Sequence, residues 1–192
     1  MFSTFKSLKQ RTSKNKPERK EFLKLLVHEF NNTPSQEMKQ QTLANLANFA
    51  YDPINYGYLK ENSILNVFMD TLNDGDPILV RFAAAGLCNI VLDPETKDYV
   101  IANGGIEAIS RCLSSKDEQT VESCITALMY LVTNESKAAI TSAEVIQCML
   151  LFADSTNVRL SNLAKIFLED YCTPQQIDAV KNSVQFIPLP TT

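Results

Sequence analysis

The fold of this chain is decided by residues 93–113, DPETKDYVIANGGIEAISRCL, which repeat the pattern of residues 52–72, DPINYGYLKENSILNVFMDTL. The two stretches align without gaps at an offset of 41 residues. The same offset continues outside them, because Leu46 corresponds to Leu87 and Leu87 to Leu128. This many matches at one spacing indicate an internal repeat, and periods of about 40–47 residues are typical of helical solenoids.

Each unit of the repeat contains the pattern of two packed helices. In residues 52–92, apolar residues recur every three or four positions in two runs, 64–72 and 80–91, as on one face of a helix. Between the runs stand Asp76, a helix-capping residue, and Pro77, which suits a first helical turn. One unit cannot bury both apolar faces by itself, so we expect neighbouring units to stack around one continuous core.

Several short motifs add a family resemblance to this pattern. Residues 102–106, ANGGI, followed by 112–115, CLSS, resemble the signature of an armadillo repeat. The resemblance extends from about residue 20 onward and is strongest to a branch of small scaffold proteins. The stretches that carry it are 43–53 (LANLANFAYDP), 147–150 (QCML), 166–170 (IFLED) and 187–190 (IPLP). It implies an all-α, armadillo-type right-handed helical solenoid of about four repeats, with degenerate first and last repeats.

The expected chain organisation has three parts. Residues 1–19 form a basic N-terminal arm, residues 20–172 the solenoid, and residues 173–192 a C-terminal tail. The predicted repeats are 20–51, 52–92, 93–132 and 133–172. Within the tail we expect at most a last helical turn in residues 175–183. The segment that follows is extended because each proline disfavours helix before it; it is either a docking strand or a segment without fixed contacts. Its residues are Ile187, Pro188, Leu189 and Pro190.

Charge is distributed unevenly along the chain. Residues 1–24 carry eight Lys and Arg against two acidic residues, whereas the remainder carries ten basic and twenty acidic residues. The arm is open to four interpretations: a solvated terminus, a nuclear-import signal, a nucleic-acid contact or, last in rank, a mitochondrial presequence. The acidic body argues against a surface that follows phosphates, so RNA contact is expected to be indirect or weak. No apolar run approaches the length of a membrane span, and no secretory signal is expected.

The last helix of each unit lines the concave wall of such a solenoid, and we expect a protein partner there. Asn48 and Asn89 are the strongest candidates, since an amide offers both donor and acceptor to an extended backbone. The alternative is that these asparagines hydrogen-bond within the stack. Nuclear-import receptors place Trp one turn before this Asn, but this chain has no Trp, so capture of basic signals is not expected. The complete predicted row is Asn48, Arg81, Asn89, Glu122, Tyr130 and Glu169.

The sequence offers no catalytic or metal site, and we expect neither an enzyme nor a cofactor. His28 is the only histidine, and no phosphate-binding glycine loop or zinc-type Cys/His spacing occurs. The five cysteines form no C-x-x-C pair and lie among apolar helical residues, which predicts free thiols in a reducing compartment. A small-molecule substrate is not expected either.

The resemblance, rather than the repeat period, implies a specific function. It implies a nuclear scaffold that pairs with an RNA-recognition-motif protein, RNA-binding protein 48, and with other components of the minor spliceosome. In that setting the pair associates with the capped end of a minor-class small nuclear RNA. Two alternatives remain: a cytoplasmic adaptor in adhesion or protein turnover, and a direct nucleic-acid binder that uses the basic arm.

Overall fold

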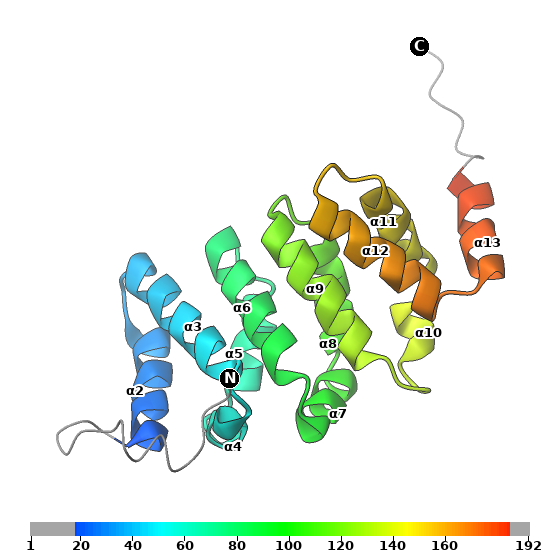
Figure 1. Cartoon of the computed structure of the whole chain (residues 1–192). Coiled ribbons are helices and arrows are strands. Elements are labelled where there is room, and N and C mark those ends of the chain that lie inside the picture. The colour runs from blue at the N-terminus through cyan, green and yellow to red at the C-terminus, as the bar shows by residue number, and fades with distance from the viewer. Residues whose placement is uncertain (1–17, 185–192) are drawn as a thin grey trace.

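The computed structural model describes residues 18–184, which form an elongated row of helices (Figure 1). No strand occurs between residues 18 and 184. The helices are α2 (Arg19–Asn32), α3 (Gln36–Ala50), α4 (Tyr56–Glu61), α5 (Ile64–Thr71), α6 (Pro77–Ile90), α7 (Pro94–Ala102), α8 (Gly105–Arg111), α9 (Glu118–Leu131), α10 (Lys137–Ile140), α11 (Ala143–Ala153), α12 (Val158–Tyr171) and α13 (Pro174–Val184), with 3₁₀ helices η1 (Pro53–Asn55) and η2 (Cys112–Ser114). Residues 1–17 and the predicted docking strand at 187–190 lie outside the described residues.

The helices fall into units that recur with the period of the sequence. The first unit consists of α2 and α3, and the next three units consist of α4–α6, α7–α9 and α10–α12. We call α3, α6, α9 and α12, the last helix of each unit, the inner helices; they lie side by side across the view of Figure 1. The prediction of an all-α solenoid with an incomplete first unit is therefore confirmed.

Each inner helix begins with a capping residue at the same place in the repeat. The side chains of Ser35, Asp76, Asp117 and Asn157 each accept a hydrogen bond from a backbone N–H of the first turn. These bonds satisfy donors that have no partner within the helix. Pro77 follows Asp76 at the start of α6, as the sequence predicts.

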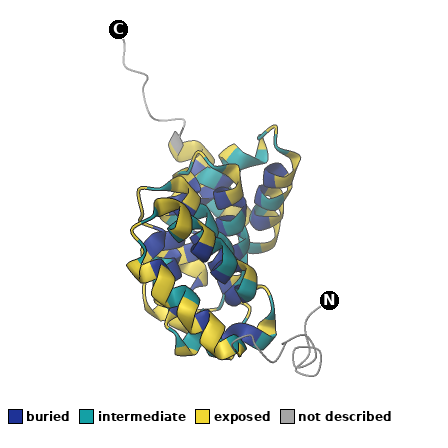
Figure 2. Cartoon of the chain, turned by 90° about the vertical axis from the view of Figure 1, so that its left-hand side faces the viewer, coloured by how far each residue is buried: buried dark blue, intermediate teal, exposed yellow. Residues whose placement is uncertain are grey.

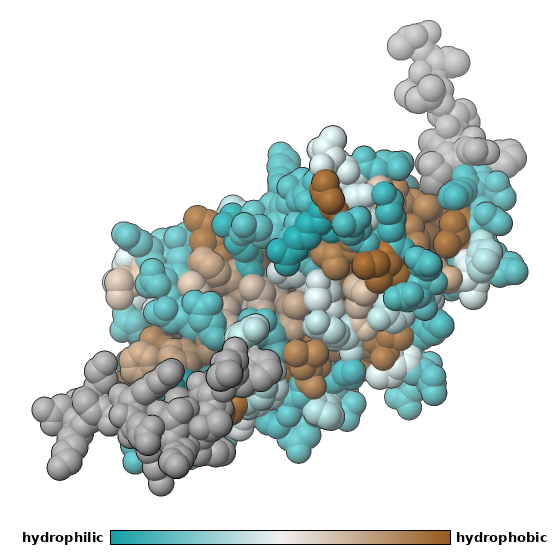
Figure 3. Space-filling view, viewed as in Figure 1, coloured by the Kyte–Doolittle hydropathy of each residue, from teal (hydrophilic) through white to brown (hydrophobic). Residues whose placement is uncertain are grey.

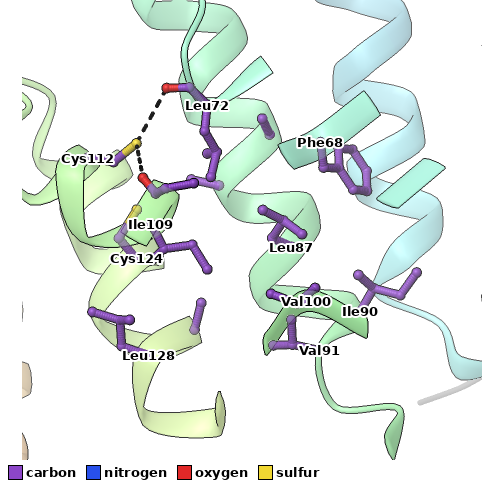
Figure 4. Close-up of a cluster of buried hydrophobic side chains, with 14 of the residues drawn as sticks. Phe68, Leu72, Leu87, Ile90, Val91, Val100, Ile109, Cys112, Cys124 and Leu128 are labelled. Atoms are coloured by element: carbon purple, nitrogen blue, oxygen red, sulfur yellow. Dashed lines mark hydrogen bonds between the residues drawn. The ribbon is translucent and has the colours of Figure 1, made fainter. Parts of the chain in front are cut away.

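The core runs continuously through the stack. Leu46, Leu87 and Leu128, which are equivalent in the repeat, are all fully buried. Each inner helix packs on the next one in chain order. Figure 4 shows side chains of α5 to α9 converging around Phe68 and Leu87, and Figure 2 shows buried residues on the faces that neighbouring helices share. Removal of these apolar surfaces from water between units is what stabilises the stack.

The C-terminal segment differs from its prediction. Instead of at most one turn, the structure has an 11-residue helix, α13, packed on α11. At its start the Gln176 side chain accepts from the N–H of Thr173 at 2.9 Å, and Thr173 Oγ1 accepts from the N–H of Gln176 at 3.2 Å. Val180 is buried farther along the helix. This reciprocal cap and the buried side chain explain why the helix extends beyond a single turn.

Candidate functional site

A groove crosses the inner helices and has a volume of about 570 Å³. Its lining residues are Ala44, Ala47, Asn48, Arg81, Phe82, Ala85, Asn89, Glu118, Gln119, Glu122, Ser123, Asn157 and Arg159. We call this the inner groove. In Figure 3, which looks onto the inner helices, pale and apolar surface crosses the middle of the face between more hydrophilic margins. Of the six residues predicted for the binding row, the structure brings four to this groove: Asn48, Arg81, Asn89 and Glu122.

The two predicted asparagines have different roles in the groove. The Asn89 side chain donates from Nδ2 to the Ala47 carbonyl at 3.1 Å, so this amide links α6 to α3. Asn48 is exposed, and its side chain has no hydrogen bond to another residue within 18–184. Asn89 therefore follows the alternative in which the amide stabilises the stack, whereas Asn48 presents both a donor and an acceptor to the groove.

Arg81 is held by the next helix. Its guanidinium makes two contacts with the Asp117 carboxylate, Nη2 to Oδ1 at 2.8 Å and Nε to Oδ2 at 3.0 Å. Asp117 also caps α9 through Thr120. Burial raises the pKa of this carboxyl, but the hydrogen bonds from Thr120 and Arg81 outweigh burial, and the pKa lies below its usual value. Arg81 thus contributes to the contact between α6 and α9 as well as to the groove wall.

Glu122 is engaged in the same way one unit later. Its carboxylate accepts from Arg159 Nε at 2.9 Å and from Asn157 Nδ2 at 3.1 Å, and the residue is buried. One unit earlier, Gln40 donates to Asp76 at 2.6 Å. Gln40, Arg81 and Glu122 are spaced by 41 residues, and each contacts the cap of the following inner helix. We call these contacts the cap ladder; the register shows it, but the sequence analysis did not recognise it.

Two residues of the predicted row lie apart from the groove. Tyr130 is exposed near the end of α9, and Glu169 is exposed on α12; neither lines the groove. Tyr51 and Leu92, which the prediction omitted, are exposed just after the ends of α3 and α6. They are equivalent in the repeat, so their common position is visible in the sequence once the register is known.

Comparison with known proteins places this groove in a family. The pattern of the armadillo/beta-catenin-like repeat matches residues 93–133. Armadillo repeat-containing protein 7 of Mus musculus is 48% identical over 177 residues, which cover 89% of each chain. The chain belongs to the armadillo-repeat family. The armadillo-repeat fold is a protein-binding scaffold, and the resemblance noted in the sequence is confirmed.

Solved structures of designed armadillo repeat proteins share the fold. One, described as designed for modular peptide recognition, superposes with a TM-score of 0.71 at 17% identity, covering 85% of this chain and 71% of that chain. Another, in complex with the peptide (KR)4, has a TM-score of 0.70 at 16% identity, covering 88% of this chain and 76% of that one. At these identities the likeness shows the armadillo fold.

The cysteines of this armadillo-repeat protein are free thiols set among packed helices. Cys112 and Cys124 are buried, and Cys112 Sγ donates to the Leu72 carbonyl at 3.6 Å (Figure 4). Burial raises the pKa of the Cys88 thiol to about 11, so this group stays protonated at neutral pH. Residues 18–184 contain no group of three or more His, Cys, Asp or Glu that could hold a metal ion.

His28, the only histidine, is exposed on α2. None of the helices within the described range is long and apolar enough to cross a membrane.

Proposed function

We propose that this armadillo-repeat protein is a non-enzymatic scaffold in nuclear RNA processing that pairs with RNA-binding protein 48 in the minor spliceosome. The observation that carries the binding role is the inner groove, with its small side chains and the unengaged amide of Asn48. The partner, the spliceosomal setting and the nuclear location rest on the family resemblance of stretches such as 43–53 and 166–170.

The groove suits an extended polypeptide. Ala44, Ala47 and Ala85 keep its floor low, so that a backbone can approach the inner helices closely. An exposed Asn can donate to a backbone carbonyl and accept from a backbone N–H at once. The related designed proteins are described as recognising peptides, and one is bound to a peptide. A segment of the partner lying across α3, α6 and α9 is the interaction that this geometry favours.

Direct binding tests the groove. Isothermal titration of RNA-binding protein 48 into the full chain is compared with titration into Asn48→Ala, which removes the free amide. We expect the Kd to rise about 5- to 10-fold, the effect of losing one or two hydrogen bonds. Asn182→Ala is the matched control, because Asn182 is also exposed but lies on α13. Equal Kd values for Asn48→Ala and Asn182→Ala would show that the partner binds elsewhere.

The wider row needs a second variant. Asn89→Ala combined with Tyr130→Ala removes two further predicted contacts, and its Kd should rise more than that of either single change. Because Asn89 also bonds to Ala47, the melting temperature is measured beside the Kd. A lower melting temperature with unchanged Kd would remove both residues from the binding site.

The cellular role is tested by affinity purification of the full chain with mass spectrometry. Recovery of RNA-binding protein 48 together with minor-class small nuclear ribonucleoproteins supports the proposal. Recovery of cadherin or ubiquitin-ligase components instead would favour a cytoplasmic adaptor. RNA affinity that falls steeply with salt and disappears with residues 1–17 would favour direct nucleic-acid binding. The tail is tested by deleting residues 185–192: full assembly without them would exclude the Ile187–Pro190 strand as a docking element.

A further inference from the structure

The lower edge of the inner face carries exposed apolar side chains in register. Tyr51, Leu92 and Tyr130 are 61%, 54% and 41% exposed, and they stand at or next to the C-terminal ends of α3, α6 and α9. These three residues form what we call the edge strip. Large apolar side chains aligned at the same end of consecutive helices indicate an interaction surface rather than scattered exposure.

The surroundings of the edge strip are electronegative. Between α7 and the loop after α9 lies a hollow of about 610 Å³, whose lining includes the carboxylates of Asp98 and Glu135 and the side chain of Ile101. In addition, the last turns of α3, α6 and α9 contain no basic residue, so the negative ends of these helices are not offset. The strip therefore fits an occupant that combines apolar side chains with positive charges.

The N-terminal segment of the chain has this chemistry. Residues 1–17 contain five Lys and Arg and no acidic residue, whereas the rest of the chain has 13 basic against 22 acidic residues. Three large apolar residues, Phe2, Phe5 and Leu8, are spaced by three positions among these charges. Three residues of extended chain cover about 10 Å, close to the 8–10 Å between the axes of packed helices. The spacing thus allows one apolar side chain for each inner helix.

The segment also starts at the right place. Helix α2 begins at the same edge of the molecule at which α3 ends (Figure 1). Its first residue, Arg19, lies 5.2 Å from the centre of the Phe49 ring and donates to Asn55 Oδ1 at 3.2 Å. Seventeen residues can span up to about 60 Å when extended, whereas three helix ends cover only about 20 Å. The segment can therefore reach every residue of the edge strip.

We infer that residues 1–17 dock in cis on the edge strip, with Phe2, Phe5 and Leu8 on the apolar side chains and lysines toward the acidic hollow. The contact places this segment beside the inner groove, where it competes with the protein partner. The competition, but not the docking itself, rests on the proposed function. The interaction combines apolar burial with charge attraction, so high salt weakens it.

Photo-crosslinking of the full chain tests the docking without any partner. Phe5 is replaced by benzoylphenylalanine, the protein is irradiated, and the crosslinked peptides of the monomer band are identified by mass spectrometry. We expect crosslinks to peptides that contain Tyr51, Leu92 or Tyr130, with a yield that falls at least threefold in 1 M NaCl. Crosslinks elsewhere, none at all, or crosslinks only between two chains would overturn the inference.

Two matched variants add specificity. Leu92→Lys places a positive charge on the strip and should reduce the yield at least fivefold, whereas Ile166→Lys, at an exposed apolar position of α12, should leave it unchanged. Equal yields in the two variants would contradict the inference, and circular dichroism verifies that both remain folded.

The competition is measured separately, by titrating RNA-binding protein 48 into a full chain with Lys6, Lys9 and Arg11 changed to Gln. A Kd at least threefold tighter supports the competition. An unchanged Kd with crosslinks retained would leave the docking established and count against the groove as the partner's site.

Discussion

Ser63 and Gly104 show how one backbone requirement is met by two different residues. They are 41 residues apart and precede α5 and α8, and both have a left-handed backbone, with φ of 56° and 76°. A residue with a Cβ pays about 1–2 kcal/mol in this conformation, whereas glycine does not. Ser63 is exposed and makes no cap hydrogen bond that would compensate. The second unit thus contains a local strain that the third unit avoids.

We expect a reciprocal pair of substitutions to reveal this strain. Ser63→Gly should raise the free energy of unfolding by about 0.5 kcal/mol, because relief of strain exceeds the added freedom of the unfolded chain. Gly104→Ala should lower it by about 1–2 kcal/mol. Urea unfolding followed by circular dichroism measures both. A stabilising Gly104→Ala would show that the left-handed turn is not required.

Gly86 supports a second prediction, which opposes simple helix propensity. In the middle of a helix, alanine is favoured over glycine by about 1 kcal/mol. A Cβ at Gly86, however, would collide with the ring of Phe68, which is fully buried. Gly86→Ala should therefore destabilise by about 1–3 kcal/mol, the usual cost of overpacking. Adding Phe68→Leu should return part of this loss, so that the two changes are not additive in a double-mutant cycle; strict additivity would show that the ring is not the obstacle.

At this scale the sequence predicted what depends on neighbours in the chain. The cap at Asp76 and the proline after it could be assigned because their partners are the next few backbone groups. The roles of Arg81 and Glu122 could not be assigned in the same way. Both looked like free charges on an inner face, but their partners, Asp117 and Arg159, are 36 and 37 residues away. Such pairing follows only from the three-dimensional register of adjacent units.

The cap ladder connects one element to the next through ionisable groups. The pKa of Asp76 is lowered chiefly by the hydrogen bond from Gln36, with Gln40 and two backbone N–H groups adding to it and burial opposing. The pKa of Asp117 is lowered because hydrogen bonds outweigh burial. Carboxylates with a lowered pKa in the folded state stabilise the protein above their unfolded pKa, and this contribution is lost as pH falls through the folded pKa. The caps should therefore weaken below about pH 4.

The expected result is an acid-dependent stability that these two carboxylates carry in part. Asp76→Asn with Asp117→Asn keeps a capping side chain at both sites but removes the ionisable groups. The double variant should be less stable than the parent by about 1–2 kcal/mol at pH 7 and should approach it at pH 3. Urea denaturation at several pH values provides the comparison. A constant difference across this range would contradict the assigned pKa directions.

Elements were predicted well where the repeat is regular and poorly where it ends. The inner helices followed from apolar spacing, because each buries one face against identical neighbours. Helix α13 was underestimated, since it has no counterpart in the other units and buries little apolar surface. Its signal was nevertheless present: Thr173 and Gln176 stand at capping-box spacing, with Pro174 at the first helical position.

The whole molecule has the stability pattern of a one-dimensional stack. The central inner helices α6 and α9 have a neighbour on both sides, whereas α2 and α13 pack at the two ends. The outward positions Lys165 and Glu169 of α12 are exposed and polar, as expected where a solenoid ends. In such a stack each unit depends on its neighbours, so helices at the ends open more readily than those in the middle.

Hydrogen exchange with mass spectrometry should show this gradient directly. We expect the slowest amide exchange in α6 and α9, close to the limit set by global unfolding, and exchange at least tenfold faster in α13. Val180→Ala, which trims the buried side chain of α13, should accelerate exchange in that helix about tenfold more while leaving α6 unchanged. If the substitution accelerated α6 and α13 equally, the end helix would unfold only together with the core, and the stack would behave as one cooperative unit.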